Sequence, residues 1–481
     1  MTMHRALQLM NYGSLTPITK YRTRNSWHWS SRFFTSRVIR SPTESDEELR
    51  IFIVAGEVSG DIIGSRLMAS LKLLSPVNVK FAGVGGSLMV KEGLQSQFPM
   101  EDLAVMGVWE LVPHIQKFWV RLKQATQSAL DFQAHVIVTV DSKGFSFRLL
   151  KYIRAGCAQR GLACPVCVHY VAPSFWAWKG GEKRLKGLRN IVDHILCILP
   201  FEEEICKMNG LAATFVGHPI LEDVFNKYAG DNLERSKWKV VGDGAKFRKE
   251  NGLSADATII SLLPGSRIQE VDHMLPIFGQ ALGELKHNFN DLTAAIPVAP
   301  NEQVAKSVKK FTERWTVPVV LLSGESLESI YNAFDASIAA LSTSGTAVLQ
   351  LQLARLPCVV AYRASLLTEW LIQFRTKLSY ISLPNILMDS TVLPEALFSE
   401  CTPSRLAIMI RQLVQNEHLQ NQQAIAAEKI FDILKPPVKH LSGVSFQWTN
   451  SSQLLQKLRA PTPSGSHTIP CLFSCRFSLK Y

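Results

Sequence analysis

The chain has 481 residues, of which 47% are hydrophobic and 19% are charged. This composition is typical of a globular protein with a buried core, and the length predicts two or three domains of roughly 150 residues each. No stretch approaches the roughly 18 uninterrupted apolar residues that a membrane span requires, so we expect any membrane contact to be peripheral.

The N-terminal segment differs from the rest of the chain. Its first 43 residues contain seven Arg or Lys residues, many Ser and Thr, and no Asp or Glu. This is typical of an organellar transit peptide, which we predict over residues 1–45, and the excess of Arg over Lys favours mitochondria over plastids. A disordered basic tail is the alternative. More than half of the net charge of +12 lies in this segment, so the mature protein is only mildly basic and no nucleic-acid partner is predicted.

The nine cysteines are scattered and odd in number, which favours a reducing compartment over a disulfide framework. Cys164 and Cys167 form a C-x-x-C pair, with His169 nearby. In the strand-like V-C-V-H-Y, however, Cys167 and His169 point to one face and Val168 to the other. No second ligand pair follows at a zinc spacing, so we interpret these residues as core residues and expect no metal site.

Two series of apolar strands alternating with helical patterns predict two parallel, doubly wound sheets. The first series comprises Ile51–Ala55, Val79–Gly83, Val136–Val140, Val166–Val171 and His194–Ile198. The second comprises Thr258–Leu263, Thr293–Pro297, Val317–Leu322, Ala336–Leu341 and Pro357–Tyr362. We therefore expect an α/β chain with domains at 50–220 and 256–402, a linker or insertion at 221–255, C-terminal helices at 403–458 and a flexible tail at 459–481.

Polar residues follow two strands of the first series. The segment I-F-I-V-A-G-E-V-S-G-D carries Glu57, Ser59 and Asp61 in or near the turn after the first strand, where ligands bind in open α/β sheets. Its glycines do not match G-x-G-x-x-G, so no dinucleotide site is indicated, and close helix–strand packing is the alternative explanation. Asp141 ends the strand Val136–Val140 and could act as a general base, or simply cap the following helix.

The second series contains two turns suited to anions. Gly265-Ser266-Arg267 precedes a helix that begins near Glu270, and Ser344-Gly345-Thr346 precedes another. Free N–H groups at helix starts, with an arginine beside them, can hold a phosphate or diphosphate. Ordinary capping turns are the alternative for each alone, but together they favour a nucleotide diphosphate. The chain has no P-loop motif and no suitable D-x-D, so a metal-bridged diphosphate is not predicted.

The segment from Ala104 to Lys123 mixes large apolar residues with cations. Met106, Trp109 and Val112 are its candidate lipid contacts. Such a mixture suits a lipid-binding groove or a membrane surface, although core packing would explain some of these residues equally well.

Taken together, these stretches resemble the lipid A disaccharide synthase family, glycosyltransferases of GT-B architecture. The motifs that carry the resemblance are A-G-E-V-S-G-D (55–61), L-A-V-M-G (103–107), H-Y-V-A-P-S-F-W-A-W-K (169–179), L-P-F-E (199–202), F-V-G-H-P (215–219), L-L-P-G-S-R-x-x-E-V (262–271), S-G-T-A (344–347) and S-L-P-N-I-L (382–387). The resemblance implies two Rossmann-like domains with an interdomain cleft. It also implies inverting transfer from UDP-2,3-diacylglucosamine to 2,3-diacylglucosamine 1-phosphate, giving a β-1,6-linked disaccharide phosphate and UDP, with no cofactor besides the donor.

The resemblance also assigns roles to residues. Asp141 stands where the family has its essential carboxylate, the base for the acceptor 6-hydroxyl, and Glu57 positions the acceptor or shares the proton. The remaining assignments are Gly265, Ser266, Arg267, Glu270, Ser344, Gly345, Thr346, Gln350 and Asn385 for the UDP-sugar, and Ser59, Asp61, Met106, Trp109 and Val112 for the acylated acceptor.

The chain departs from the family pattern at two places. It has Asp141-Ser142-Lys143-Gly144-Phe145-Ser146 where the family reads Asp-Ala-Pro-Asp-Phe-Asn, and Gln350 where the family tends to have Glu. These departures keep open the alternative of a non-catalytic UDP-sugar or lipid-binding homologue. A second alternative is an enzyme like the UDP-N-acetylglucosamine 2-epimerases, although a soluble hexosamine would not need the apolar segment 104–123. The partners expected are the two acylated substrates and a peripheral membrane surface, with a homo-oligomer as an open alternative.

Overall fold

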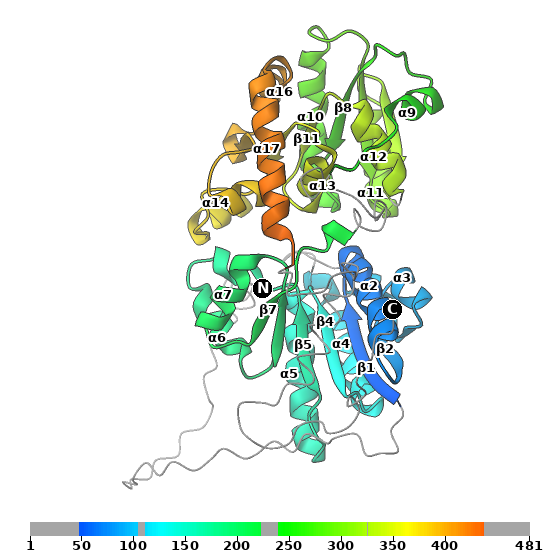
Figure 1. The fold of residues 1–481 in the computed structure, drawn as a ribbon, viewed down its shortest axis with the longest axis vertical. Helices are drawn as coiled ribbons and strands as arrows, with labels where there is room; N and C mark the ends of the chain where they lie inside the picture. Colours follow the sequence, from blue (N-terminus) through cyan, green and yellow to red (C-terminus); the bar gives the residue numbers. More distant parts are fainter. Residues whose placement is uncertain (1–47, 104–110, 223–238, 325, 437–481) are drawn as a thin grey trace, which may run out of the picture. The chain divides into compact units, whose positions relative to one another are not determined.

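The computed structural model describes residues 48–103, 111–222, 239–324 and 326–436 (Figure 1). Within them the chain forms two compact units, unit 1 (48–176 and 180–217) and unit 2 (177–179 and 218–435). The predicted transit peptide and the predicted C-terminal tail both lie outside the described residues. No helix among the described residues is long and apolar enough to cross a membrane.

Unit 1 contains a seven-stranded parallel sheet in the order β3-β2-β1-β4-β5-β6-β7. Its strands are β1 (Glu48–Ala55), β2 (Asn78–Val84), β3 (Gln95–Ser96), β4 (Val136–Val140), β5 (Val166–Tyr170), β6 (His194–Cys197) and β7 (Ala213–Phe215). Its helices are α2 (Val58–Leu74), α3 (Ser87–Lys91), η1 (Met100–Asp102), α4 (Leu111–Asp131), α5 (Lys143–Arg160), η2 (Ser174–Ala177), α6 (Gly181–Leu188) and α7 (Pro200–Met208).

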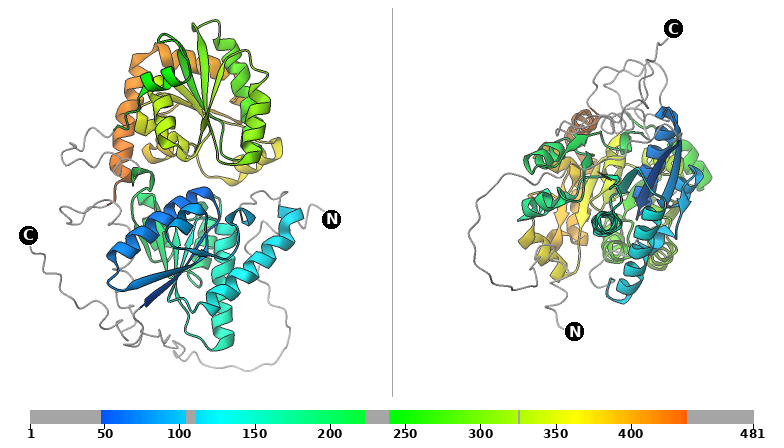
Figure 2. Two further views of the ribbon diagram at one scale, coloured as in Figure 1. Left: turned by 90° about the vertical axis from the view of Figure 1, so that its right-hand side faces the viewer. Right: turned by 90° about the horizontal axis from the view of Figure 1, so that it is seen from below.

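Both faces of this sheet are buried, as a parallel sheet requires. Side chains alternate along β1, so Phe52 packs with α4 and α5 on one face while Ile53 packs with α2 on the other. Figure 2 shows helices on both sides of the sheet. The same alternation confirms that Cys167 and Val168 lie on opposite faces, in different core clusters. The described residues contain no group of three or more His, Cys, Asp or Glu that could hold a metal ion.

His169 on β5 is fully buried. Its Nδ1 lies 2.8 Å from Thr139 Oγ1, and its ring centroid lies 4.6 Å from that of Phe147. Its Nε2 has no hydrogen-bond partner among the described residues. Burial lowers the pKa of His169 to about 3, so the imidazole is neutral in the folded protein at neutral pH.

Unit 2 repeats the architecture with a six-stranded parallel sheet in the order β10-β9-β8-β11-β12-β13. Its strands are β8 (Thr258–Leu263), β9 (Leu292–Val298), β10 (Val319–Ser323), β11 (Ala339–Ser342), β12 (Cys358–Tyr362) and β13 (Glu395–Leu397). Its helices are α9 (Gly244–Glu250), α10 (Ile268–Leu285), α11 (Glu302–Thr312), α12 (Leu327–Ala336), α13 (Thr346–Ala354), α14 (Leu366–Arg375), α15 (Leu383–Met388), η3 (Phe398–Glu400), α16 (Pro403–Gln415) and α17 (Glu417–Leu434). Two parallel α/β sheets in one chain confirm the predicted fold class.

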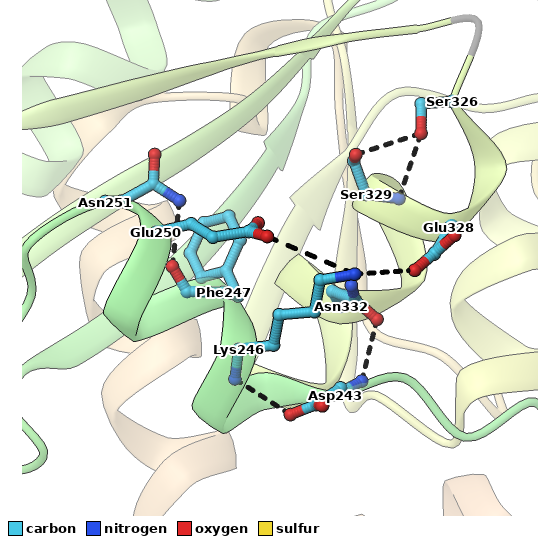
Figure 3. A network of polar contacts seen from close by, with 9 residues as sticks. All are labelled: Asp243, Lys246, Phe247, Glu250, Asn251, Ser326, Glu328, Ser329 and Asn332. Carbon is cyan, nitrogen blue, oxygen red and sulfur yellow. Dashed lines mark hydrogen bonds and ion pairs between the residues drawn. The ribbon is translucent and has the colours of Figure 1, made fainter.

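The segment predicted as a linker contains helix α9, which packs against α12 (Figure 3). Phe247 on α9 is buried in a core cluster. The backbone N–H of Asp243 donates to Asn332 Oδ1 at 2.7 Å, and Lys246 Nζ lies 2.9 Å from Glu328 Oε1. A Cβ on Gly242 would lie 2.0 Å from the Tyr331 carbonyl oxygen, so the chain passes too close to α12 for any other residue. Residues 239–252 therefore pack as part of unit 2.

The predicted strands match the sheet centres better than the sheet edges. The prediction for β4 and for β8 agrees with the structure at both ends, but β3, β7 and β13 were not predicted. These three strands have two or three residues each, too few to show a periodic pattern. The predicted start of β11 at Ala336 was also early, because Ala336 ends α12.

Candidate functional site

Each sheet has a point where the direction of strand addition reverses. In unit 1, β1 lies between β2 and β4, and in unit 2, β8 lies between β9 and β11. The connections that leave two such neighbouring strands diverge to opposite faces, which opens a crevice at their carboxyl ends, the usual ligand site of this fold class. The turns after β1, β4, β8 and β11 carry most of the candidate residues predicted from sequence.

In unit 1, the turns after β1 and β4 touch. A Cβ on Gly56 would lie 2.3 Å from Ser142 Oγ and 3.0 Å from Ser142 Cβ, so a larger residue would displace the Ser142 side chain. Glu57 immediately follows Gly56 as the N-cap residue of α2, and Asp141 immediately precedes Ser142. The structure thus brings the two predicted catalytic carboxylates to the same edge of the sheet.

The backbone that carries Asp141 is in an unusual conformation. Asp141 and Ser142 have φ of 47° and 42°, in the left-handed region that residues with a Cβ seldom adopt. Local hydrogen bonds hold this turn, since Asp141 N–H donates to the Tyr170 carbonyl at 2.9 Å and Ser146 Oγ donates to the Asp141 carbonyl at 2.7 Å. Strained turns fixed by their surroundings are common at functional sites. The turn leaves the Asp141 residue half-buried at the sheet edge.

A cation shares this edge with the two carboxylates. Lys143 begins α5, and partial desolvation lowers the pKa of its ammonium group although the residue reaches solvent. The carboxylate of Asp141 raises this pKa, Arg184 lowers it, and Glu57 raises it. Asp141, Arg184 and Glu57 are therefore each within electrostatic range of Lys143. From sequence, Lys143 was only a departure from the family pattern, and Arg184 was not among the candidate residues.

Asp61, which we expected to contact the acceptor, has a role within the fold instead. Its side chain is buried and accepts three backbone hydrogen bonds, from Gly86 and Met89 to Oδ1 at 2.8 and 3.1 Å and from Leu88 to Oδ2 at 3.1 Å. These bonds join α2 to the start of α3, which leaves the carboxylate occupied.

The other predicted acceptor contacts are only partly described. Ser59 is exposed in the first turn of α2, beside Glu57. Met106 and Trp109 lie outside the described residues, as does the side chain of Val112 near the start of α4.

In unit 2, the turn after β8 presents the start of α10. Gly265 has φ of 113°, and a Cβ there would lie 2.5 Å from Glu270 Oε2, so the turn requires glycine. Ser266 and Arg267 are exposed, and an Arg267 guanidinium nitrogen lies 3.3 Å from Glu270 Oε1. Glu270 thus orients the arginine beside the free N–H groups of an 18-residue helix, where an anion is stabilised.

The turn after β11 lies next to the turn after β8. Thr343 N–H donates to the Leu263 carbonyl at 2.9 Å, which joins the two turns. Ser344 Oγ donates to the Ile381 carbonyl at 2.8 Å, and Thr346 is exposed at the start of α13. Gln350 is half-buried one turn further along α13. Two helix N-termini therefore follow adjacent strands of the sheet.

Asn385, which we expected to contact the UDP-sugar, is fully used by the fold. Its Oδ1 accepts from Val392 and Leu393 N–H at 2.9 and 2.8 Å, and its Nδ2 donates to the Leu393 carbonyl at 2.8 Å and to Glu395 Oε1 at 2.7 Å. The side chain is completely buried. Asn385 therefore holds the loop before β13, and we remove it from the candidate site.

Tyr362 is a neighbour of this site that the sequence analysis missed. It ends β12, the next strand along from β11. Desolvation raises the pKa of its hydroxyl group, Glu270 raises it further, and Arg267 lowers it. Its position was available from sequence, because Tyr362 ended a predicted strand and the carboxyl ends of parallel strands share one edge.

Two doubly wound units in tandem, each with polar side chains at its switch point, define the GT-B fold. Two solved structures share the fold. They are the Staphylococcus aureus MnaA–UDP co-structure (TM-score 0.52, 12% identity) and the Neisseria meningitidis UDP-GlcNAc 2-epimerase bound to UDP-GlcNAc (TM-score 0.50, 10% identity). The matches cover 80% of this chain and 96% and 99% of those chains.

Sequence comparison identifies the family. The model of the family described as lipid-A-disaccharide synthetase matches residues 51–444. The probable mitochondrial lipid-A-disaccharide synthase of Arabidopsis thaliana is 53% identical over 84% of this chain and 88% of its own length. The lipid-A-disaccharide synthase of Rhodospirillum centenum is 40% identical over 78% of this chain and 87% of its own. The chain belongs to the lipid-A-disaccharide synthetase family.

Proposed function

We propose that the protein is an inverting glycosyltransferase that joins UDP-2,3-diacylglucosamine to 2,3-diacylglucosamine 1-phosphate. The products are a β-1,6-linked disaccharide 1-phosphate and UDP. Membership of the family supports the reaction. The observation that carries the assignment of roles is the pairing of the Glu57 and Asp141 turns at the switch point of unit 1, with Arg267 at the equivalent point of unit 2.

In unit 1, Asp141 removes the proton from the acceptor 6-hydroxyl as that oxygen attacks the anomeric carbon of the donor. The new carbon–oxygen bond forms as the bond to UDP breaks, so the configuration inverts in one step without a covalent intermediate. Glu57 and the exposed hydroxyl of Ser59 lie at the same edge and hold the acceptor sugar. The proton remains on Asp141 until the product leaves.

In unit 2, the leaving diphosphate carries the developing negative charge. Arg267, oriented by Glu270, and the N–H groups at the starts of α10 and α13 stabilise that charge. Gly265 and Gly345 let the backbone approach the phosphates, Ser266, Ser344 and Thr346 contribute hydroxyl groups, and Gln350 bonds to a ribose hydroxyl. The reaction needs no cofactor besides its UDP-sugar donor.

Mass spectrometry of the lipids after incubation of the purified mature chain with both acylated substrates tests this proposal. We expect the disaccharide 1-phosphate and an equal amount of UDP. Conversion of UDP-N-acetylglucosamine to its 2-epimer would favour the epimerase alternative. Binding of UDP-sugar without turnover, under conditions in which a bacterial relative is active, would favour the non-catalytic alternative.

We also propose that α14 contacts a membrane whose surface is anionic. Trp370 and Phe374 are 59% and 60% exposed and stack with their rings 5.5 Å apart and nearly parallel, although such large apolar groups are usually buried. Lys179 lies 5.5 Å from the Phe374 ring, and Arg375 and Lys377 follow in the chain. Aromatic side chains flanked by cations suit the lipid–water interface.

Vesicle flotation tests this contact. We expect Trp370→Ser combined with Phe374→Ser to weaken binding to vesicles with anionic lipid by roughly tenfold or more. Ile425→Ser on α17, which removes another exposed apolar side chain, serves as the matched control. Equal binding of the double variant and the control would contradict the proposal.

Finally, we propose that residues 1–45 direct the protein to mitochondria and are removed there. An Arg-rich segment without acidic residues follows an inside-negative potential, and a relative with 53% identity is named as mitochondrial. Cleavage must leave β1 intact, because Glu57 follows its end. Fusion of residues 1–48 to a fluorescent protein tests the targeting. Fluorescence in the cytosol or in plastids would contradict the mitochondrial location.

A further inference from the structure

Two cations in unit 1 converge on one aromatic ring close to the proposed catalytic base. Lys143 Nζ lies 5.8 Å from the centroid of the Phe175 ring, and Arg184 Cζ lies 5.7 Å from it. Lys143 begins α5, Phe175 lies in η2, and Arg184 belongs to α6. Three separate elements thus bring these side chains together.

The Phe175 ring is held in place by its surroundings. It packs against the core cluster on the face of the sheet covered by α4 and α5, and its centroid lies 6.3 Å from that of Phe147. A Cβ on Gly181 would lie 1.8 Å from the Phe175 carbonyl oxygen, so the start of α6 fits closely against η2. The two cations therefore contact an aromatic ring whose position is held by packing on both sides.

Neither cation has a close ion-pair partner within the described part of the chain. No carboxylate there forms an ion pair with Lys143 or Arg184, and the Lys143 ammonium group donates only a long hydrogen bond, 3.5 Å, to Ser174 Oγ. Desolvation lowers the pKa of Lys143, the carboxylates of Asp141 and Glu57 raise it, and Arg184 lowers it. Holding two like charges together in a partly desolvated place is unfavourable, and an anion bound between them would relieve that cost.

We propose that Lys143, Arg184 and Ser174 form the binding site for the 1-phosphate of the acceptor, over the ring of Phe175. This inference rests on the proposed function, because it assigns the acceptor to unit 1. The 6-hydroxyl and the 1-phosphate lie on opposite sides of one hexose ring. A phosphate site must therefore lie about one sugar's width from the base, and Lys143 follows Asp141 by two residues in the same turn.

The residue types suit a phosphate monoester. The planar guanidinium of Arg184 can donate two parallel hydrogen bonds, Lys143 adds a compact charge, and the Ser174 hydroxyl adds a neutral donor. Lys143 also stands where the family pattern has proline, so this chain has a cation at a position where the family has none. The structure thereby connects that departure to recognition of the acceptor.

Kinetics with two acceptors tests the site. The assay compares 2,3-diacylglucosamine 1-phosphate with the same lipid bearing a free 1-hydroxyl, both in mixed micelles, using the full purified chain. We expect the wild type to prefer the phosphorylated acceptor by about thirtyfold in kcat/KM, as charge-assisted hydrogen bonds imply. Lys143→Gln and Arg184→Gln should each lose about tenfold on the phosphorylated acceptor only, with an unchanged KM for the donor.

Two further variants serve as controls. Lys151→Gln removes an exposed lysine from the same helix and should leave both acceptors unaffected. Lys143→Arg should recover most of the preference for phosphate, because it restores the charge. An unchanged preference in Lys143→Gln and Arg184→Gln would overturn the inference. So would an equal loss on both acceptors, since that indicates a general defect in the fold or the base.

Equilibrium binding keeps this inference separate from the proposed reaction. If the wild type turns over neither acceptor, the proposed function fails, and the affinity of the two lipids for the protein then tests the phosphate site alone. Tighter binding of the phosphorylated lipid that is lost in Arg184→Gln supports the site. Equal binding of both lipids by the wild type overturns it.

Discussion

Replacement of Asp141 by asparagine separates the chemistry of its carboxylate from its place in the fold. Asparagine has nearly the same size as aspartate but cannot accept the proton of the acceptor hydroxyl. Residue 141 has φ of 47°, and asparagine tolerates this left-handed conformation better than most residues, whereas alanine would add a backbone cost of about 1–2 kcal/mol. The Asp141→Asn variant is therefore a cleaner probe than Asp141→Ala.

The structure predicts a large effect on rate and a small one on stability. The hydrogen bonds that hold the turn use the backbone of residue 141, through the Tyr170 carbonyl and Ser146 Oγ, and both survive the substitution. The free energy of unfolding should change by less than about 0.5 kcal/mol. Loss of a positioned general base should lower kcat by about 10²–10⁴-fold. The affinity for UDP should remain nearly that of the wild type, because its proposed contacts lie in unit 2.

Mass spectrometry of the disaccharide product measures the turnover, and calorimetry measures the affinity for UDP. Asp291→Asn is the matched control, since Asp291 also has φ of 47° but is exposed in unit 2, away from the proposed site. The control should retain full turnover. Turnover of Asp141→Asn within about threefold of the wild type would remove Asp141 from the role of base.

Three other predictions concern single residues. Arg267→Ala should weaken UDP binding and turnover together by about 10–100-fold, because the guanidinium group no longer stabilises the diphosphate. EDTA should have no effect on the wild type. Loss of activity in EDTA and its recovery with magnesium would refute stabilisation of the diphosphate by Arg267. Gly265→Ala should lower UDP affinity at least about tenfold, because the added Cβ collides with Glu270 and disturbs the turn that presents the helix N-terminus; unchanged affinity would argue against that turn as the diphosphate site. His169 has a pKa of about 3 when folded and 6.5 as its ordinary value, so below pH 6.5 the unfolded chain binds a proton that the folded chain does not. The free energy of unfolding should therefore fall with decreasing pH, and this group contributes up to about 1.4 kcal/mol per pH unit. Denaturant titrations at several pH values should show a weaker pH dependence of the unfolding free energy for His169→Gln, because glutamine does not titrate. The same pH dependence in the variant and the wild type would refute the contribution.

The periodicity of the sequence was enough to predict both sheets. Runs such as Val136–Val140 and Thr258–Leu263 are mostly apolar, without the alternation of polar and apolar residues, which occurs when helices cover both faces of a parallel sheet. The rule that ligands bind at the carboxyl ends of such strands then indicated the turns that hold Glu57, Asp141 and Arg267. These inferences depend only on local pattern and on a general property of the fold class.

The roles of individual polar residues did not follow from local pattern in the same way. Asp61 and Asn385 lie in motifs that suggest a site, yet the hydrogen bonds that occupy them come from Gly86 and Leu393, residues 25 and 8 positions away. A carboxylate or an amide has the same appearance in a sequence whether it binds a ligand or a backbone N–H group. Only the three-dimensional positions of the donors distinguish the two cases.

By itself, the sequence determined the fold class, the two series of strands, the edge of each sheet at which we expect ligands, and the family to which the chain belongs. Tertiary structure alone decided that Gly56 brings the turn of Glu57 against that of Asp141, and that Lys143 and Arg184 meet over Phe175 although 41 positions separate them in the chain. The physical reason is that periodicity records which face of an element is buried. It does not record which distant element covers that face or which charges come together at its end.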